Sequence, residues 1–176
     1  YNPARPSEII GSVCQAGTDE VDAALKVAKE SYLSWRDVAP AERAGYLFRA
    51  AAYLRENIHE MSALQVLEVG KQWDQAHADV AESIDFLEYY GREMIRLGRP
   101  RRMGHAPGEM SQLFYQGKGV AAVIAPWNFP LAISVGMVSA AIVSGCPVLY
   151  KPAGISSVVG YGLVKRRRGA GVPDGV

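Results

Sequence analysis

Residues 119–153 read GVAAVIAPWNFPLAISVGMVSAAIVSGCPVLYKPA, and Lys151 is the only charged residue among them. Residues 120–125 form a short run of β-branched residues and alanines, which predicts a strand buried on both faces. Residues 147–151 predict a second buried strand. Runs of this kind are typical of parallel sheets, whose strands are covered on both sides.

The segment between the two strands predicts a helix. Pro130 suits its first turn, where a missing N–H costs nothing, and the helix should run through Val143 and stop at Gly145. A strand, a helix and a strand within about thirty residues form one βαβ crossover, which belongs in a parallel sheet. Ligands of such sheets bind beyond the carboxyl ends of the strands. We therefore expect chemistry at residues 127–129 and 151–153.

Two other interpretations of this stretch have to be weighed. About 20 apolar residues can cross a membrane, but Pro126, Asn128 and Pro130 divide the run into a strand and a helix that are too short to do so. A βαβ unit with no site would be the default on periodicity alone. The polar Asn128 between two aromatic residues, and the lone Lys151 at the other strand end, favour a site.

The composition is that of a globular protein. The chain has 176 residues, of which 49% are hydrophobic and 21% charged, with a formal net charge of +1. This charge gives no reason to expect nucleic acid or an anionic membrane as a partner. The two cysteines, Cys14 and Cys146, make no disulfide framework and no metal cluster, which indicates a reducing cytoplasm. The first residues show no secretory signal, and Tyr1 is not an initiator, so we expect the chain to start inside a larger protein.

Helical periodicity dominates the first half of the chain. One helix should be capped by Thr18 and end near Trp35, and a second should begin at Pro40. A third should stop at Gly70, and residues 73–97 predict one long helix.

Two non-helical segments flank these helices. Residues 2–15 are rich in proline and then in β-branched residues, which predicts a turn and a short strand. Residues 99–108 predict a loop or the entry to a hairpin. Residues 110–116 predict a strand. Residues 117–119 predict a turn that connects it to the buried strand that follows.

The motifs APWNFPL (residues 125–131) and LYKPA (residues 149–153) resemble the paired signature of the NAD(P)-dependent aldehyde dehydrogenase superfamily. The resemblance covers nearly the whole chain, including an opening hairpin near the N-terminus. Two further segments, LQVLEVGK (residues 64–71) and DVAESIDFLEYYGRE (residues 79–93), look closest to one branch. That branch is the 1-pyrroline-5-carboxylate (L-glutamate 5-semialdehyde) dehydrogenases, which include the C-terminal half of bifunctional proline-utilisation enzymes.

The resemblance implies an α/β architecture that is incomplete in this chain. Residues 1–98 would form an N-terminal hairpin and helical region, residues 99–118 a hairpin arm that pairs across subunits, and residues 119–176 the first part of a cofactor-binding βαβ in a Rossmann-like parallel sheet. It therefore implies a homo-oligomer and is compatible with a fused proline dehydrogenase domain.

The implied activity is the oxidation of L-glutamate 5-semialdehyde to glutamate with NAD, or with NADP as a second candidate. The family's nucleophilic cysteine, its general-base glutamate and its glycine-rich turn over the cofactor pyrophosphate lie in motifs that do not occur here. We therefore expect residues 1–176 alone to be inactive. A non-catalytic remnant that binds nucleotide or mediates oligomer contacts is the alternative, and a reading frame that stops at Val176 would favour it.

Asn128 is the catalytic candidate. Covalent oxidation of an aldehyde passes through a tetrahedral oxyanion, and an amide N–H aimed at that oxygen can stabilise it strongly. In the family, the asparagine of this motif has that role. The alternative is an asparagine that only caps the helix starting at Pro130.

The resemblance also assigns residues to cofactor and substrate. Trp127 and Phe129 would lie by the nicotinamide and the substrate tunnel, with core packing as the alternative. Lys151 would hold the adenosine ribose, unless it is a solvated strand end. Gly154 stands where many members have an acid that binds the ribose hydroxyls, which leaves NAD preference open. The full set of cofactor candidates is Ile124, Ala125, Pro126, Trp127, Asn128, Lys151, Pro152, Ala153 and Gly154.

The remaining candidates have plainer alternatives. Glu82, in the predicted long helix, would lie near the substrate tunnel with Phe129, or else is an ordinary surface acid. Cys146 starts the second strand, at the end opposite the ligands and with no cation beside it, so we expect a buried core residue. The three histidines, His59, His77 and His105, lack metal-ligand spacing and should lie on the surface, and no metal site is expected. The basic run at residues 165–168 predicts a solvated helical turn rather than a nucleic-acid patch.

Overall fold

The computed structural model describes all 176 residues except the side chains of residues 166–169. Its first half consists of α1 (Thr18–Arg36), α2 (Pro40–Glu56), α3 (Ile58–Val69) and α4 (Trp73–Leu97). The predicted helix at residues 73–97 is confirmed in full. Pro40 is the first residue of α2, and α3 ends at Gly70, whose φ of 67° lies in the left-handed region that favours glycine.

The start of α1 differs from the prediction by one residue. Thr18 is already helical and Gly17 is the N-cap, without a side-chain cap. The N–H of Gly17 instead donates to Glu20 Oε2 at 2.7 Å. Glu20, the third residue of the helix, thus satisfies the N–H of the N-cap residue, and the threonine cap that we expected is not formed.

The predicted βαβ crossover is confirmed. Strand β3 (Ala121–Ile124) pairs in parallel with β4 (Val148–Lys151), and α5 (Ala132–Val143) connects them. The helix begins two residues after Pro130 and is followed by Gly145, with a φ of 90°. A 3₁₀ turn, η1 (Gly154–Ser156), and α6 (Ser157–Gly169) follow β4.

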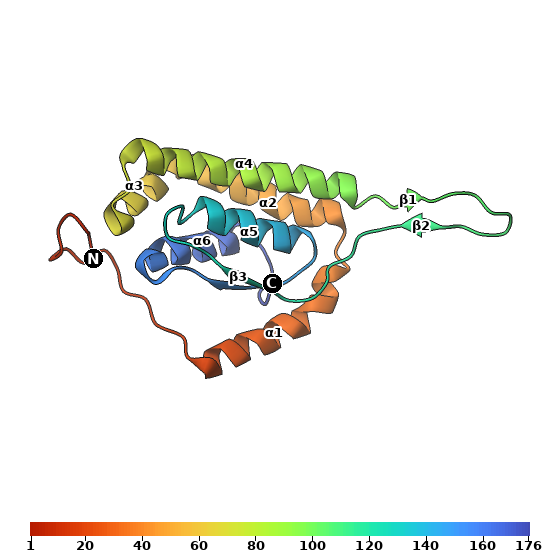
Figure 1. Ribbon diagram of the computed structural model, residues 1–176, viewed down its shortest axis with the longest axis horizontal. Coiled ribbons are helices and arrows are strands. Elements are labelled where there is room, and N and C mark those ends of the chain that lie inside the picture. The colour runs from red at the N-terminus through yellow and green to blue at the C-terminus, as the bar shows by residue number, and fades with distance from the viewer.

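The prediction that the strands are buried on both faces was wrong. In β3, Val123 is buried under α5, whereas Ile124 is 71% exposed. The second face of the two strands borders a groove of about 740 Å³, whose other wall is formed by Val21, Ala24 and Val27 of α1. Figure 1 shows the first part of α1 set apart from the layer of α2, α4 and α5, with β3 between them.

One core joins the helical half to the crossover. Helix α4 packs against both α2 and α5, and its buried residues include Val80, Ile84 and Leu87. These helices approach closely: a Cβ on Gly91 of α4 would lie 2.5 Å from the Phe48 ring of α2. A side chain there would push the two helices apart.

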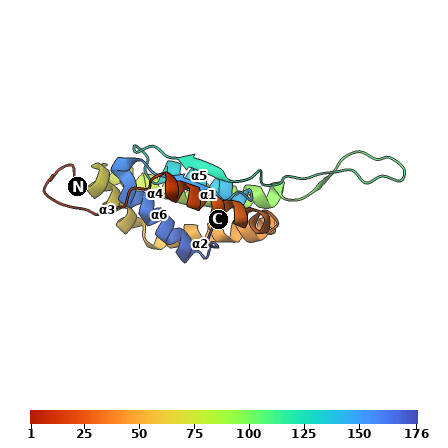
Figure 2. The same ribbon diagram turned by 90° about the horizontal axis from the view of Figure 1, so that it is seen from below.

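The hairpin arm is present but only briefly paired. Strands β1 (Arg101–Arg102) and β2 (Gln112–Leu113) are antiparallel, so the strand predicted at residues 110–116 is reduced to two residues. Figures 1 and 2 show the arm extending away from the body, where no other part of the chain can support it. A two-stranded ribbon in water is marginal on its own, which explains the short pairing.

The predicted strand and opening hairpin within residues 2–15 are not formed. The backbone pairs only locally, with the Asn2 N–H donating to the Glu8 carbonyl at 2.9 Å and an isolated bridge between Asn2 and Arg5. Residues 7–17 have no regular structure because no neighbouring strand accepts them. In the part of the chain that the structure describes, none of the helices combines the length and apolarity needed to span a bilayer.

Helix α5 carries no charge, and its carboxyl end is capped from elsewhere. The Trp35 indole N–H donates to the Ile142 carbonyl at 2.9 Å, and Arg43 Nε donates to the Val143 carbonyl at 2.8 Å. The same guanidinium also donates to the carbonyls of Arg36 and Val38. Arg43 and its bond to Val143 are buried, so no water can replace the donor at that carbonyl.

We expect Arg43→Met to lower the free energy of unfolding by about 3 kcal/mol, because it leaves the buried carbonyl of Val143 and two part-buried carbonyls without a donor. The control is Arg92→Met, which removes a 67%-exposed arginine that pairs with Glu88 and should cost less than about 0.5 kcal/mol. Denaturant unfolding of the protein that contains this chain measures both. Equal losses in the two variants would contradict the capping role.

Candidate active site

The two motif-bearing strand ends lie side by side. The parallel register places Ile124 opposite Lys151, and the N–H of Ala125 donates to the Lys151 carbonyl at 3.1 Å. The loop that starts at Ala125 and the turn that starts at Pro152 therefore leave the sheet at the same edge. The structure thus brings together the two groups of residues that the sequence singled out.

The loop between β3 and α5 presents its aromatic and polar side chains outward. Trp127 is 55% exposed, Phe129 is 38% exposed, and Asn128 is exposed between them. Within this chain, Trp127 is therefore not packed in the core. The helix-cap alternative for Asn128 is also wrong, because α5 has no side-chain cap of its own.

The N-terminus of α5 is capped by Asp79 of α4, a residue that the sequence analysis did not identify. Its carboxylate accepts from the N–H groups of Leu131 and Ala132, both at 3.3 Å. Burial raises the pKa of Asp79, while Lys71 and the two N–H groups act in the opposite direction. A carboxylate at this end of the helix also complements the helix dipole.

Lys71, which follows Gly70 at the end of α3, was also missed. Its ammonium donates to the Asn128 carbonyl at 3.0 Å and lies 3.7 Å from Asp79 Oδ1. It also lies 4.0 Å from the centroid of the Phe129 ring, within the range of a cation–π contact. A signal for Asp79 was present in the sequence, since this acid falls on the same helix face as Val80 and Ser83 in the apolar stripe of α4.

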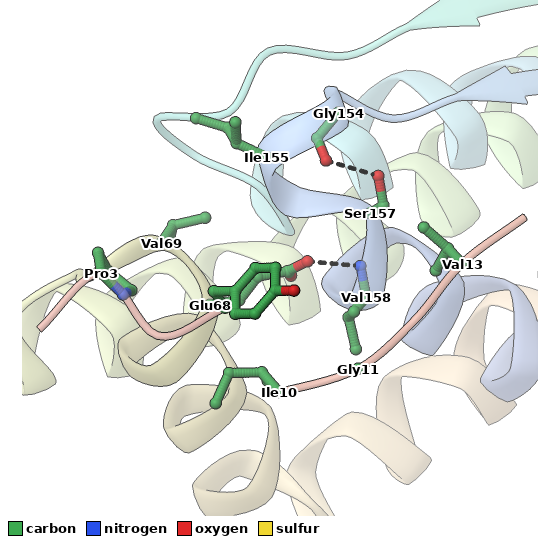
Figure 3. Close-up of a pocket in the computed structure, with 11 residues that line it drawn as sticks. Pro3, Ile10, Gly11, Val13, Glu68, Val69, Gly154, Ile155, Ser157 and Val158 are labelled. Carbon is green, nitrogen blue, oxygen red and sulfur yellow. Dashed lines mark hydrogen bonds between the residues drawn. The ribbon is translucent and has the colours of Figure 1, made fainter. Parts of the chain in front are cut away.

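A second carboxylate holds the helix that follows β4. Glu68 accepts from the N–H groups of Val158 and Val159, both at 2.7 Å. Burial raises the pKa of Glu68, and the two backbone bonds oppose this. Figure 3 shows Glu68 facing Val158 beside a cavity of about 380 Å³, which Gly154 and Ile155 also line.

These two carboxylates decide where an anion can bind. The N-terminus of a helix after a parallel strand is the usual phosphate site of dinucleotide-binding folds. Here Asp79 occupies that position at α5 and Glu68 occupies it at α6. Neither helix can therefore hold a pyrophosphate, in agreement with the absence of a G-x-G-x-x-G sequence after β3.

Lys151 and Gly154 remain open at the strand edge. Lys151 is exposed at the end of β4. Nothing lies within 4 Å of the position that a Gly154 Cβ would take, so this turn has room for a ligand or a side chain. The next residue inward, Tyr150, donates to Ser134 Oγ at 2.8 Å, and Ser134 donates to the Pro130 carbonyl at 2.7 Å. This chain of bonds ties β4 to the Asn128 loop.

A model of the aldehyde dehydrogenase family matches residues 1–176. The chain belongs to the aldehyde dehydrogenase family. It is 47% identical over 176 residues to 1-pyrroline-5-carboxylate dehydrogenase 1 of Halalkalibacterium halodurans, with 100% of this chain and 34% of that protein covered. The chain thus spans about a third of the length of the curated relatives it matches.

Two solved structures extend the comparison. The 1-pyrroline-5-carboxylate dehydrogenase from Thermus with bound NAD matches with a TM-score of 0.97 and 43% identity, over 99% of this chain and 34% of that one. Proline utilization A from Bdellovibrio bacteriovorus inactivated by N-propargylglycine matches with a TM-score of 0.96 and 44% identity, over 99% of this chain and 18% of that one. The resemblance inferred from the motifs is therefore confirmed.

The other candidates of this aldehyde dehydrogenase chain fall in different places. Glu82 is exposed on α4, three residues after Asp79, and its charge contributes to raising the pKa of Asp79. The three histidines are exposed, as expected, and the described residues contain no cluster of three or more metal-ligating side chains. The predicted solvation of the basic run concerns side chains that, beyond Lys165, lie outside the described residues.

Cys146 differs in part from the expectation. It lies at the start of β4, at the end opposite Lys151, and accepts from the Lys118 N–H at 3.3 Å. It is half-buried rather than fully buried. The buried Arg43 interacts electrostatically with it.

Asp79 provides a test by pH. Because burial raises its pKa, the folded protein binds this proton more tightly than the unfolded chain does. The stability that this group contributes is thus complete below its ordinary pKa and is lost as the pH rises through the raised value. Asp79→Asn does not titrate, so the melting temperature of the variant relative to wild type should rise as the pH is raised from about 4, the ordinary pKa of an aspartate, toward neutral. Thermal unfolding of both proteins across this range measures the difference, and a constant difference would contradict the assignment.

Proposed function

We propose that the protein containing this chain oxidises L-glutamate 5-semialdehyde to glutamate with NAD(P), in the breakdown of proline. Relatives named 1-pyrroline-5-carboxylate dehydrogenase match the chain from end to end, which supports this substrate. The observation that carries the proposal is the exposed amide of Asn128, held at the sheet edge where Lys151 also ends. We propose that residues 1–98, 99–118 and 119–176 serve respectively as helical support, subunit-pairing arm and cofactor-binding unit.

The role of Asn128 follows from the charge that develops during aldehyde oxidation. When a nucleophile adds to the aldehyde carbon, the carbonyl oxygen becomes an oxyanion, and an amide N–H directed at it lowers the barrier. In the described part of the chain, no hydrogen bond engages the Asn128 side chain, so its N–H₂ is free to donate. Phe129 and Trp127 would border the substrate, with Glu82 on the neighbouring helix as a further candidate contact.

This chain does not supply the nucleophile in our proposal. Cys146 lies at the wrong end of β4, and Cys14 lies in the irregular N-terminal segment. We therefore propose that residues 1–176 alone are inactive and that a thiolate from elsewhere in the protein attacks the aldehyde. Both cysteines of this chain are free thiols, which suits a reducing compartment such as the cytoplasm.

The strand edge is suited to bind a ribose of the dinucleotide but not its central pyrophosphate. Lys151 offers three N–H donors to a ribose, and the open position at Gly154 leaves room for it. Residues 124–126 and 152–153 would line the same edge. When bound, the nicotinamide would accept the hydride that leaves the carbon after the thiolate has added to it. The pyrophosphate would have to be held outside this chain's two helix N-termini, because Asp79 and Glu68 occupy them.

Two proposals concern partners. The arm at residues 99–118 offers unpaired strand edges away from the body, and we propose that it pairs with a second copy of the protein. The match to proline utilization A also makes a fused proline dehydrogenase domain part of this proposal.

In the full-length protein, we expect Asn128→Ala to lower the turnover number by about 10²-fold or more, the usual cost of one oxyanion donor. The affinity for NAD should be nearly unchanged, because the lost contact forms mainly in the transition state. Steady-state rates with glutamate semialdehyde and calorimetric titration of NAD measure the two quantities. Gln75→Ala, which removes an exposed amide of α4, is the control. Unchanged turnover in Asn128→Ala would rule out the oxyanion role.

Cofactor choice is tested at Lys151 and Gly154. A cation without a neighbouring acid attracts a 2′-phosphate, so wild type should bind NADP measurably as well as NAD. Lys151→Ala should weaken NADP more than NAD, whereas Gly154→Glu, which has space for its side chain, should favour NAD. Isothermal titration of both cofactors decides this. If wild type shows no binding of NADP, and Lys151→Ala has the same cofactor affinities as wild type, Lys151 is not part of the adenosine site.

A further inference from the structure

Lys71 contacts two consecutive residues of the loop that carries Asn128. Its ammonium donates to the carbonyl of Asn128 itself, at 3.0 Å, and covers the ring of the next residue, Phe129, at 4.0 Å. The side chain is only 10% exposed, and its carboxylate partner Asp79 is completely buried, 3.7 Å away. A buried ion pair is costly to desolvate and seldom contributes much to stability, so a role in fixing the geometry of the loop has to be considered.

Lys71 and Asp79 hold the loop on both sides of Phe129 and Pro130. Upstream, Lys71 holds the carbonyl of Asn128. Downstream, Asp79 holds the N–H groups of Leu131 and Ala132. The carbonyl direction of a residue depends on its ψ angle, so a fixed Asn128 carbonyl restricts the backbone from which the Asn128 side chain projects.

We propose that Lys71 and Asp79 are positioning residues for the reaction: together they hold the Asn128 backbone so that its side-chain amide is aimed at the developing oxyanion. This rests on the oxyanion role given to Asn128 above. The contact with Phe129 fixes the neighbouring ring by the same ammonium. A misplacement of about 1 Å in such a site can cost up to about 10²-fold in rate.

The test is a double-mutant cycle in the full-length protein. Lys71→Met alone would leave a buried, unpaired carboxylate, so the variant used is Lys71→Met/Asp79→Asn, which removes both charges and keeps similar shapes. In the wild-type background it should lower kcat at least about tenfold with little change in the KM for NAD. In the Asn128→Ala background the same pair of changes should lower kcat less than about twofold, because the residue that it positions is gone.

Lys29→Met, which replaces an exposed lysine of α1, is the matched control and should leave kcat unchanged in both backgrounds. Equal losses of kcat in both backgrounds would overturn the proposal, since a general structural defect acts independently of Asn128. If the paired variant does not fold, the nearly isosteric Asp79→Asn takes its place in the same cycle.

A second readout separates this proposal from the proposed function. Amide hydrogen exchange across residues 127–132, followed by mass spectrometry, should be faster in the Lys71→Met/Asp79→Asn protein than in wild type or Lys29→Met. Unchanged exchange would overturn the positioning role. If wild type oxidises no aldehyde, the proposed function fails, and faster exchange in the paired variant would still support the hold of Lys71 and Asp79 on the loop.

Discussion

The buried helix α5 cannot supply hydrogen-bond partners for the N–H and carbonyl groups at its own ends. No residue between Lys118 and Lys151 carries a charge, and the helix has no capping side chain of its own. The first N–H groups and last carbonyls of a helix still need partners when water is excluded. Asp79 supplies an acceptor at the amino end, and Arg43 supplies a donor at the carboxyl end, each with the charge that the helix dipole favours.

This constraint couples the helical half of the chain to the sheet. Asp79 belongs to α4 and Arg43 to α2, so α5 is held by the same two helices that pack against each other in the core. The cap at the amino end also determines what the site can bind. A carboxylate there stabilises α5 but excludes a phosphate, and Glu68 repeats the arrangement at α6. What remains at the edge is a polar amide, two aromatic rings and one exposed lysine.

The sequence predicted the parts of this structure that depend on neighbours in the chain. The long helix α4, the stop at Gly70 and the parallel crossover are local patterns of period, proline and glycine, and all are observed. The edge formed by Asn128 and Lys151 followed from topology and from the motif resemblance. The two-sided burial of β3 did not hold, because it depends on what packs against the sheet rather than on the strand. The caps from Asp79 and Arg43 are contacts between residues 53 and 100 positions apart, which one sequence without tertiary contacts cannot place.

The two lysines at this edge differ in how far the chain already engages their charges. Lys71 contacts a carbonyl, a carboxylate and an aromatic ring, so its charge is already engaged within the chain and its side chain is mostly covered. Lys151 ends a strand in the open. Lys71 can therefore fix the loop that carries Asn128, while Lys151 stays available to a ligand. The aromatic residues of the Trp-Asn-Phe-Pro motif differ in the same way: the Phe129 ring lies against the Lys71 ammonium, and Trp127 is more exposed. Half of the motif is thus explained by a lysine that lies 57 residues earlier in the chain.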